Sequence, residues 1–210
     1  VTPAVLVPRP ETELLVENLI KLNANDKKIK ILDLGTGSGA IIISLLGLLP
    51  MAEGTAVDIS SAALAVATEN AEKLGVRERF KPVLSDLYSK LPAGERYDII
   101  VSNPPYIPTD DITTLAADVR KEPKGALDGG KDGLDFYRRI VEGASEYLLP
   151  GGLLAFEIGI HQSSAVRQLC REHGFTVTAV RKDYAGIERM IFAAKEGSVY
   201  ADSLMAINKE

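Results

Sequence analysis

The chain alternates between short apolar runs and longer segments whose apolar residues recur at helical spacing. Short runs of apolar residues bounded by turn residues are typical of strands buried on both faces of a parallel sheet. They predict strands at residues 29–34, 54–59, 79–84, 97–102 and 153–158. Apolar positions with a period near 3.6 predict helices at residues 41–49, 62–74, 133–149 and 162–173.

The two ends of the chain depart from this alternation. Residues 1–9 are expected to be extended, and Pro10 fits the first position of a helix, where its missing N–H costs nothing. The positive end of that helix carries the acidic residues Glu11 and Glu13. Its apolar stripe is formed by Leu15, Leu19 and Leu22. Residues 175–181 and 188–194 predict a hairpin, and from Lys195 onward the weak periodicity predicts a surface appendage.

Strands that alternate with helices and end in a hairpin predict a single α/β domain. We expect a seven-stranded, mostly parallel sheet with the final strand inserted antiparallel. In such a sheet, ligands bind outside the carboxyl ends of the strands, so we expect the binding site in the turns that follow the strands.

Composition narrows the class of protein. The chain has 210 residues, 46% of them hydrophobic and 25% charged, which is ordinary for a globular domain. No apolar run reaches the roughly 18 residues that a membrane helix needs, and no signal-peptide pattern opens the chain. Cys170 is the only cysteine, so an intramolecular disulfide is excluded, and its helical pattern predicts a buried, unreactive thiol.

Charge and metal-binding residues exclude further classes. The net charge of −5 argues against a broad phosphate-binding surface. Two histidines and one cysteine offer too little material for a zinc site, and we expect no metal.

The run Asn-Pro-Pro-Tyr at residues 103–106 follows the apolar strand 97–102 directly. Two prolines cannot continue that strand, and each restricts the residue before it to extended conformations. Asn103 offers a side-chain acceptor, Pro104 a carbonyl acceptor, and Tyr106 a flat aromatic face. The set suits a planar group carrying an NH2, although a proline-rich turn after a strand is the simpler alternative. The run resembles the signature of S-adenosylmethionine-dependent methyltransferases that act on amino or amide nitrogen.

The glycine turn at residues 33–40 separates a predicted strand from a predicted helix, which is where a cofactor approaches the backbone. The turn by itself also satisfies the dinucleotide-binding fingerprint. Asp33 favours S-adenosylmethionine, because its carboxylate would meet the methionine ammonium but would repel a pyrophosphate. Gly39 is expected to let the chain pass close to the nucleoside.

Two further strand ends carry carboxylates. Asp58 follows the glycine turn by about 20 residues, a spacing that suits a carboxylate binding both ribose hydroxyls. Its alternative role is to cap the helix that follows, a role that Ser60 or Ser61 fills equally well. At the next strand end, similar methyltransferases use an acidic residue for the adenine amino group, which points to Asp86, with Leu87 packing on the adenine face.

Several segments together look like a more specific family. The segments at residues 7–13, 33–39, 103–107, 122–127, 132–134 and 157–159, with Gln162, Asp183 and Arg189, resemble the protein-(glutamine-N5) methyltransferases of peptide chain release factors. The resemblance spans roughly residues 3 to 194. That family usually has a small helical domain before the Pro-Arg-Pro-Glu-Thr segment. We therefore expect this chain, which opens at Val1, to be the catalytic part of a longer protein.

The resemblance implies a fold, a division of the chain and a set of site residues. It implies a Rossmann-like class I methyltransferase fold, with an opening segment and helix at residues 1–28, a catalytic domain at 29–195 and an appendage at 196–210. The implied catalytic residues are Asn103, Pro104 and Tyr106. The implied cofactor-binding residues are Asp33, Gly35, Thr36, Gly37, Ser38, Gly39, Asp58, Ile59, Asp86, Leu87 and Asn103. The implied substrate-binding residues are Leu6, Arg9, Asn103, Pro104, Pro105 and Tyr106, although for Arg9 a solvated helix start is the simpler interpretation.

The implied reaction is methyl transfer from S-adenosyl-L-methionine, leaving S-adenosyl-L-homocysteine, to the glutamine of a Gly-Gly-Gln loop in class I release factors. We expect a cytoplasmic enzyme that binds neither a membrane nor, directly, nucleic acid. The alternatives are an amino-methyltransferase of DNA or RNA that flips a base into the same pocket, and a non-catalytic module that binds S-adenosylmethionine. An NAD oxidoreductase is a third alternative, but this chain lacks an obvious acid to support hydride transfer.

Overall fold

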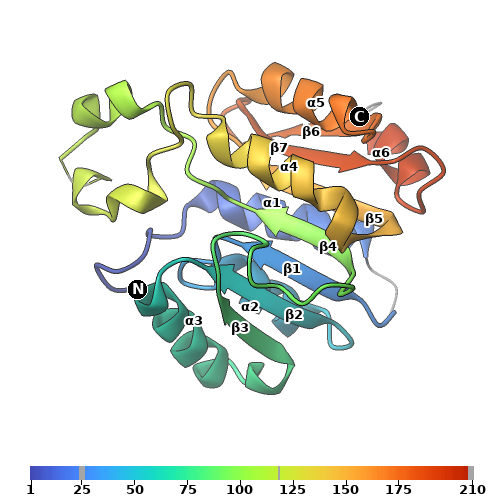
Figure 1. The fold of residues 1–210 in the computed structure, drawn as a ribbon, viewed down its shortest axis with the longest axis horizontal. Helices are drawn as coiled ribbons and strands as arrows, with labels where there is room; N and C mark the ends of the chain where they lie inside the picture. The colour runs from blue at the N-terminus through green and yellow to red at the C-terminus, as the bar shows by residue number, and fades with distance from the viewer. Residues whose placement is uncertain (24–26, 118, 208–210) are drawn as a thin grey trace.

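A computed structural model describes residues 1–23, 27–117 and 119–207 of the chain (Figure 1). It contains one seven-stranded sheet in the order β3-β2-β1-β4-β5-β7-β6. The strands are β1 (Lys30–Leu34), β2 (Glu53–Asp58), β3 (Phe80–Leu84), β4 (Tyr97–Ser102), β5 (Leu148–Glu157), β6 (Val177–Lys182) and β7 (Glu188–Ala194). The α-helices are α1 (Pro10–Leu22), α2 (Ala40–Leu48), α3 (Ser61–Lys73), α4 (Asp135–Tyr147), α5 (Ser163–Glu172) and α6 (Ala201–Ile207).

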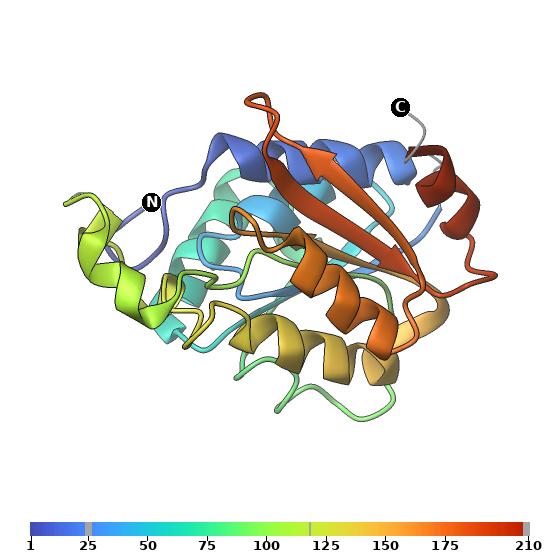
Figure 2. The same cartoon turned by 90° about the horizontal axis from the view of Figure 1, so that it is seen from above.

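Helices cover both faces of the sheet, because successive side chains of a strand point to opposite faces. Ile31 of β1 packs in one core with side chains of α1, α2, α3 and α6, whereas its neighbour Leu32 packs in the other core with α4 and α5. Figure 2 shows the two layers of helices above and below the sheet. Burial on both faces explains why the central strands are continuous apolar runs.

The expected sheet topology is confirmed. β1 pairs in parallel with β2 and β4, β3 extends the parallel set at one edge, and β5 extends it at the other. β7 then lies antiparallel between β5 and β6. The expected ends of most elements lie within two residues of the observed ones.

The junction between α4 and β5 was predicted wrongly. We expected a helix over residues 133–149 and a strand from residue 153, but α4 ends at Tyr147 and β5 begins at Leu148. Leu148 pairs with Tyr97 and Leu153 pairs with Ile99, so the intervening residues form an irregularity within one strand. Pairing with β4 therefore overrides the turn that Gly151 and Gly152 suggest.

The segment after Lys195 is not a surface appendage in its described part. Leu204 of α6 is fully buried and Tyr200 nearly so, and both belong to the core that α1 and α2 form. The Tyr200 hydroxyl donates a hydrogen bond of 2.7 Å to Asn23 Oδ1 at the end of α1. The short helix thus closes one end of a core, although residues 208–210 of the predicted appendage lie outside the described residues.

The irregular segment expected after Tyr106 contains short 3-10 helices at Thr109–Thr114, Val119–Lys121 and Lys124–Ala126. This segment projects from the carboxyl ends of the strands, beside the first residues of the chain, as both views show. Within the described ranges, none of the helices has the length and apolar content to cross a membrane.

Candidate active site

A cavity of about 390 Å³ opens at the carboxyl ends of β1, β2, β3 and β4. Its volume falls in the range of roughly 300–1,000 Å³ that is usual for small-molecule sites. Most of the predicted site residues line it: Leu6, Gly35, Thr36, Gly37, Ser38, Asp58, Ile59, Asp86, Leu87, Asn103, Pro104 and Pro105. Four predicted residues do not: Arg9, Asp33, Gly39 and Tyr106.

Three N–H groups of the glycine turn after β1 are bonded within the protein. The N–H groups of Gly35 and Thr36 both donate to the Val57 carbonyl, at 2.8 and 2.9 Å, and Gly37 N–H donates to Asp58 Oδ2 at 2.9 Å. A pyrophosphate cradle needs such donors to point at the ligand. These three N–H groups are therefore already bonded within the protein and do not point at a ligand. Gly37, with φ 56°, has the left-handed backbone that glycine accommodates.

Gly39 has a packing role and does not line the cavity, and its expected closeness to the nucleoside stays a prediction. It caps α2 with φ 81° and is buried. A Cβ at this position would lie 2.5 Å from Ile43 Cδ1 and 3.2 Å from Ala67 Cβ. The residue is therefore small because α2 and α3 approach each other here.

Asp33 lies beneath the turn, not on the cavity surface. Its side chain is fully buried, Oδ2 accepts a 2.7 Å hydrogen bond from the Thr36 hydroxyl, and Oδ1 has no hydrogen-bond partner. Burial, together with the charge of Asp58, raises the pKa of Asp33 to about 7. A cation bound near Thr36 would favour the ionised form of this carboxyl group.

Among the described residues, Asp58 is one of two aspartates that line the cavity. Oδ2 accepts from Gly37 N–H and Oδ1 accepts from Ser60 N–H, each at 2.9 Å. These two bonds fix the carboxylate and leave further lone pairs for a ligand. The expected alternative, a cap of α3, is filled by the Ser60 hydroxyl, which accepts from Ala63 N–H.

Beyond Asp58, the wall combines apolar side chains with an ion pair. Leu87 is buried in a left-handed conformation with φ 48°, and the Ser85 hydroxyl donates to its carbonyl at 2.8 Å. Asp86 pairs with Arg139 of α4 at 2.8 Å, and Arg139 in turn lies over the Phe136 ring. Phe136 and Arg139 also line the cavity. Neither was predicted, because nothing in the helical pattern of α4 marks these two positions as facing a ligand.

Asn103 and Pro104 place acceptors at the edge of β4, on the cavity. The Tyr106 ring, by contrast, packs among the side chains of α4 and β5. It lies against Gly159, where a Cβ would come within 2.9 Å of Tyr106 Cδ2. Burial is the main cause that raises the pKa of Tyr106. The ring therefore supports the turn, and the expected contact of Tyr106 with the plane of the substrate amide stays a prediction.

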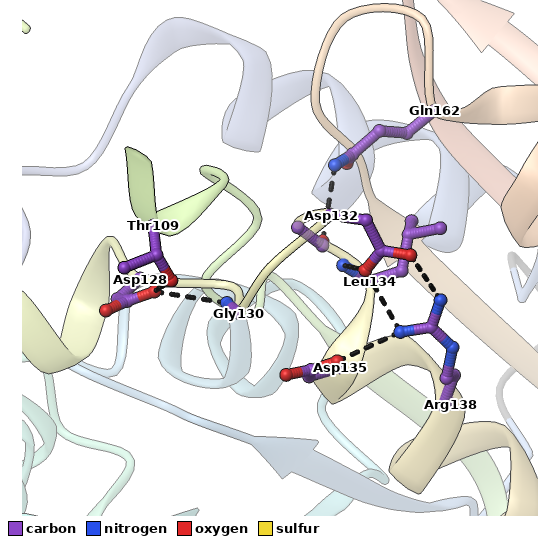
Figure 3. A network of polar contacts seen from close by, with 9 residues as sticks. Thr109, Asp128, Gly130, Asp132, Leu134, Asp135, Arg138 and Gln162 are labelled. Atoms are coloured by element: carbon purple, nitrogen blue, oxygen red, sulfur yellow. Dashed lines mark hydrogen bonds and ion pairs between the residues drawn. The ribbon is translucent and has the colours of Figure 1, made fainter. Parts of the chain in front are cut away.

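A network of polar contacts fixes the base of the segment that follows the turn (Figure 3). Gln162 Nε2 donates to the carbonyls of Tyr106 and Gly133, at 2.9 and 3.2 Å, and its Oε1 accepts from Gly159 N–H at 2.9 Å. Beside it, Arg138 pairs with Asp132 and with Asp135. The Gln162 side chain therefore ties the turn after β4 to the residues that precede α4 and to the end of β5.

The outer part of the segment forms a cover with the first residues of the chain. Pro123, Gly125 and Ala126 line the cavity from one side, and the residues from Ala4 to Leu6 together with Pro8 line it from another. Arg9 joins the two sides, since its Nη2 lies 2.8 and 2.9 Å from the two carboxylate oxygens of Glu122. Arg9 therefore does not line the cavity, and the ion pair shields its guanidinium only in part.

A buried carboxylate lies behind Asn103 that sequence reasoning did not assign. Glu157 ends β5 and is 3% exposed, and the Thr12 hydroxyl donates to its Oε2 at 2.6 Å. Burial raises the pKa of Glu157 to about 6. A charged residue ending an apolar strand beside the Asn-Pro-Pro-Tyr strand was the available signal.

Comparisons with known proteins agree on one family. The model of the methyltransferase small domain matches residues 10–127. The release factor glutamine methyltransferase of Bordetella pertussis is 50% identical over 189 residues, which cover 90% of this chain and 69% of the relative. A solved protein-(glutamine-N5) methyltransferase, described as release factor-specific, from Alicyclobacillus acidocaldarius is 32% identical with a TM-score of 0.55, covering 90% of this chain and 94% of the other.

A more distant structure shares only the fold. A Thermus thermophilus 16S rRNA N2 G1207 methyltransferase, solved with AdoMet and guanosine, is 23% identical with a TM-score of 0.66, covering 90% of this chain and 44% of the other.

Proposed function

This chain belongs to the family of release factor glutamine methyltransferases, and we propose that it methylates the side-chain amide nitrogen of the glutamine in a Gly-Gly-Gln motif of class I peptide chain release factors, using S-adenosyl-L-methionine. The observation that carries the proposal is the position of Asn103 and Pro104 on the same cavity as Asp58 and the glycine turn. A methyl acceptor and a methyl donor need to meet in one site, and this cavity offers both kinds of contact.

The lining residues fit the proposed cofactor. Asp58 supplies a fixed carboxylate for the ribose hydroxyls, and Ile59, Leu87 and Phe136 supply apolar surface for the adenine. The unpartnered Oδ1 of Asp33 gives the region next to Thr36 a preference for positive charge, as the methionine ammonium would provide. When bound, this cofactor supplies an electrophilic methyl group.

The substrate amide needs help because its nitrogen is a poor nucleophile. The nitrogen shares its lone pair with the carbonyl, as the rotation barrier of ~18–20 kcal/mol of a peptide amide shows. Asn103 Oδ1 and the Pro104 carbonyl each accept one N–H of the glutamine side chain and so aim the nitrogen into the cavity. Positioning of this kind supplies roughly 7–11 kcal/mol in well-oriented systems.

The proton needs no dedicated base in this scheme. An N-methylated amide cation is strongly acidic, so it loses its proton to water after transfer. The chain's contribution is to hold the amide by two acceptors that receive its hydrogens.

Transfer of labelled methyl from S-adenosylmethionine tests the proposal. The acceptors are a class I release factor, the same factor with the motif glutamine replaced by alanine, and RNA and DNA as separate samples. We expect label on the intact factor alone. Label on nucleic acid, or equal label on the alanine version, would contradict the proposal.

A further inference from the structure

The carboxylate of Glu157 lies directly behind the acceptor that the proposed function requires. β4 and β5 are neighbours, and Ser102 pairs with Phe156, so Asn103, which follows β4, lies beside Glu157, the last residue of β5. Thr12, in the first turn of α1, reaches over this edge and is nearly buried. Three elements far apart in the sequence thus bring an amide, a hydroxyl and a carboxylate together.

The three side chains form a directed series of hydrogen bonds. The Thr12 hydroxyl donates to Glu157 Oε2 at 2.6 Å, and Asn103 Nδ2 donates to Thr12 Oγ1 at 3.4 Å. A hydroxyl has one proton, and an ionised carboxylate has none to give. Once the Thr12 proton is committed to Glu157, only lone pairs of Thr12 Oγ1 face Asn103, and only the NH2 end of the Asn103 amide is attracted to them.

We infer that Glu157, acting through Thr12, is a positioning residue that sets the direction of the Asn103 amide, so that Oδ1 and not the NH2 faces the substrate. The inference rests on the proposed function, because it matters only if Asn103 must accept a hydrogen bond from a glutamine NH2. A flipped Asn103 would present two donors to the two donors of the substrate. Such an arrangement repels the amide that the site has to hold.

Glu157 is not placed to act as a base. Thr12 and Asn103 line the cavity, whereas Glu157 does not. The carboxylate therefore lies behind its two partners and has no route to the reacting nitrogen except through them. This distinguishes a residue that orients from one that accepts the substrate's proton.

The charge of Glu157 is set by the groups that face it from four elements. Glu11 of α1 disfavours the ionised form, whereas the hydrogen bonds from Thr12 and Asn103 and the charge of Arg189 of β7 favour it. Tyr106 after β4 and Tyr137 of α4 also interact with this carboxylate, and the Tyr137 hydroxyl donates to the backbone carbonyl of Glu157 at 2.9 Å. With burial as the largest cause, the pKa of Glu157 is raised to about 6.

The series therefore holds its direction above about pH 6 and loses it below. A protonated Glu157 can donate to Thr12 Oγ1, which frees the Thr12 proton to point at Asn103 and to stabilise the flipped amide. Turnover should then fall as the pH drops through this region.

A matched pair of substitutions at Thr12 tests the inference in the full chain. Thr12→Val keeps the shape and removes the hydroxyl, whereas Thr12→Ser keeps the hydroxyl. Because a small misplacement of a reacting group costs ~10²-fold, we expect Thr12→Val to lower kcat for the release factor by roughly 10- to 100-fold. KM and the Kd for S-adenosylmethionine should change little, and Thr12→Ser should retain a kcat close to wild type. Equal kcat in Thr12→Val and wild type would overturn the inference.

The pH profile gives a readout that a purely structural role would not change. Glu157→Gln keeps an acceptor for the Thr12 hydroxyl but does not titrate, so the acid limb of the wild-type profile near pH 6 should disappear. An acid limb that is the same in Glu157→Gln would overturn the inference.

A third measurement is independent of activity and of whether the Thr12 variants fold. The side-chain ¹⁵N and ¹H signals of Asn103 in the wild-type protein should shift with pH near 6, and in Glu157→Gln they should not. Chemical shifts of Asn103 that do not change with pH in the wild type would overturn the inference. A wild-type protein that transfers no methyl to the release factor would instead overturn the proposed function.

Discussion

The two walls of the cavity are held in place by different forces. The inner wall is the row of strand ends, where backbone hydrogen bonds to neighbouring strands and two buried cores fix Asp58, the glycine turn and Asn103. The outer wall is the cover formed by residues 4–8 and 123–126, which the ion pair of Arg9 with Glu122 joins. Glu122 is 11% exposed in its side chain and Arg9 36%, so the pair is only partly shielded from water.

This difference suggests that the two walls have different tasks. A wall built from sheet edges is preformed, as cofactor binding and amide positioning require. A wall joined by an ion pair costs little to open, since partly exposed pairs contribute on the order of 1 kcal/mol or less. We therefore expect the inner wall to carry affinity and catalysis, and the outer wall to admit and enclose the substrate loop.

The largest expected effect is on turnover, from Asn103→Ala in the inner wall. The change should leave the fold and the cofactor affinity nearly intact, because the two prolines still define the turn. It removes one acceptor and leaves a substrate N–H unpaired, so kcat should fall by ~10²-fold or more. Thermal unfolding, calorimetry with S-adenosylmethionine and single-turnover transfer measure the three quantities. Asn103→Asp is the control: it keeps acceptors of the same size for the substrate but lacks the NH2 that bonds Thr12, so its kcat should lie between those of Asn103→Ala and wild type. Unfolding of Asn103→Ala would refute the assigned role.

The next effect is on cofactor affinity, from Asp58→Ala. Loss of charge-assisted hydrogen bonds costs about 1.5–3 kcal/mol, or roughly 10- to 150-fold in Kd. Asp98 is the matched control, because its carboxylate accepts the Lys30 N–H at 2.8 Å, at the amino ends of β1 and β4 and therefore opposite the cavity. Calorimetry should show weaker binding for Asp58→Ala and unchanged binding for Asp98→Ala. The same affinity in both variants would remove Asp58 from the cofactor site.

A smaller effect, on stability alone, is expected from Gly39→Ala. The new methyl group would meet Ile43 and Ala67, and the left-handed backbone adds strain of about 1–2 kcal/mol. The free energy of unfolding should fall by roughly 1–3 kcal/mol, and cofactor affinity of the folded protein should persist. Gly47→Ala in the same helix meets nothing within 4 Å and should stabilise the protein by roughly 0.5–1 kcal/mol. A selective loss of cofactor affinity in Gly39→Ala would restore the direct contact that the sequence suggested.

The smallest effect is expected in the outer wall, from Glu122→Gln. Breaking its ion pair with Arg9 should change global stability by less than about 1 kcal/mol and raise KM for the release factor without changing kcat. Hydrogen exchange should speed up in residues 109–126, and binding of cofactor with a Gly-Gly-Gln peptide should slow it in the wild type. Glu69→Gln, which breaks the exposed pair with Lys73, is the control for a surface charge. If the exchange rates change neither in the variant nor on binding of the peptide, this segment is a rigid part of the fold.

The sequence by itself determined the order of strands and helices and most of the inner wall. Its apolar runs are buried on both faces, and proline or glycine ends them where the chain must leave the sheet, so the turns after β1 and β4 could be located from local chemistry alone. Asp58 was identifiable for the same reason, since it ends a strand next to the glycine turn in the sheet.

Only the tertiary structure decided which side chains face the cavity and which support it. Phe136 lines the cavity from the first turn of α4. Arg9 does not line it and pairs instead with Glu122, more than a hundred positions away in the sequence. Thr12 and Glu157 meet across 145 positions of sequence. Periodicity tells which face of a helix is buried, but contacts between distant segments depend on how the elements pack, and that information is spread over the whole chain.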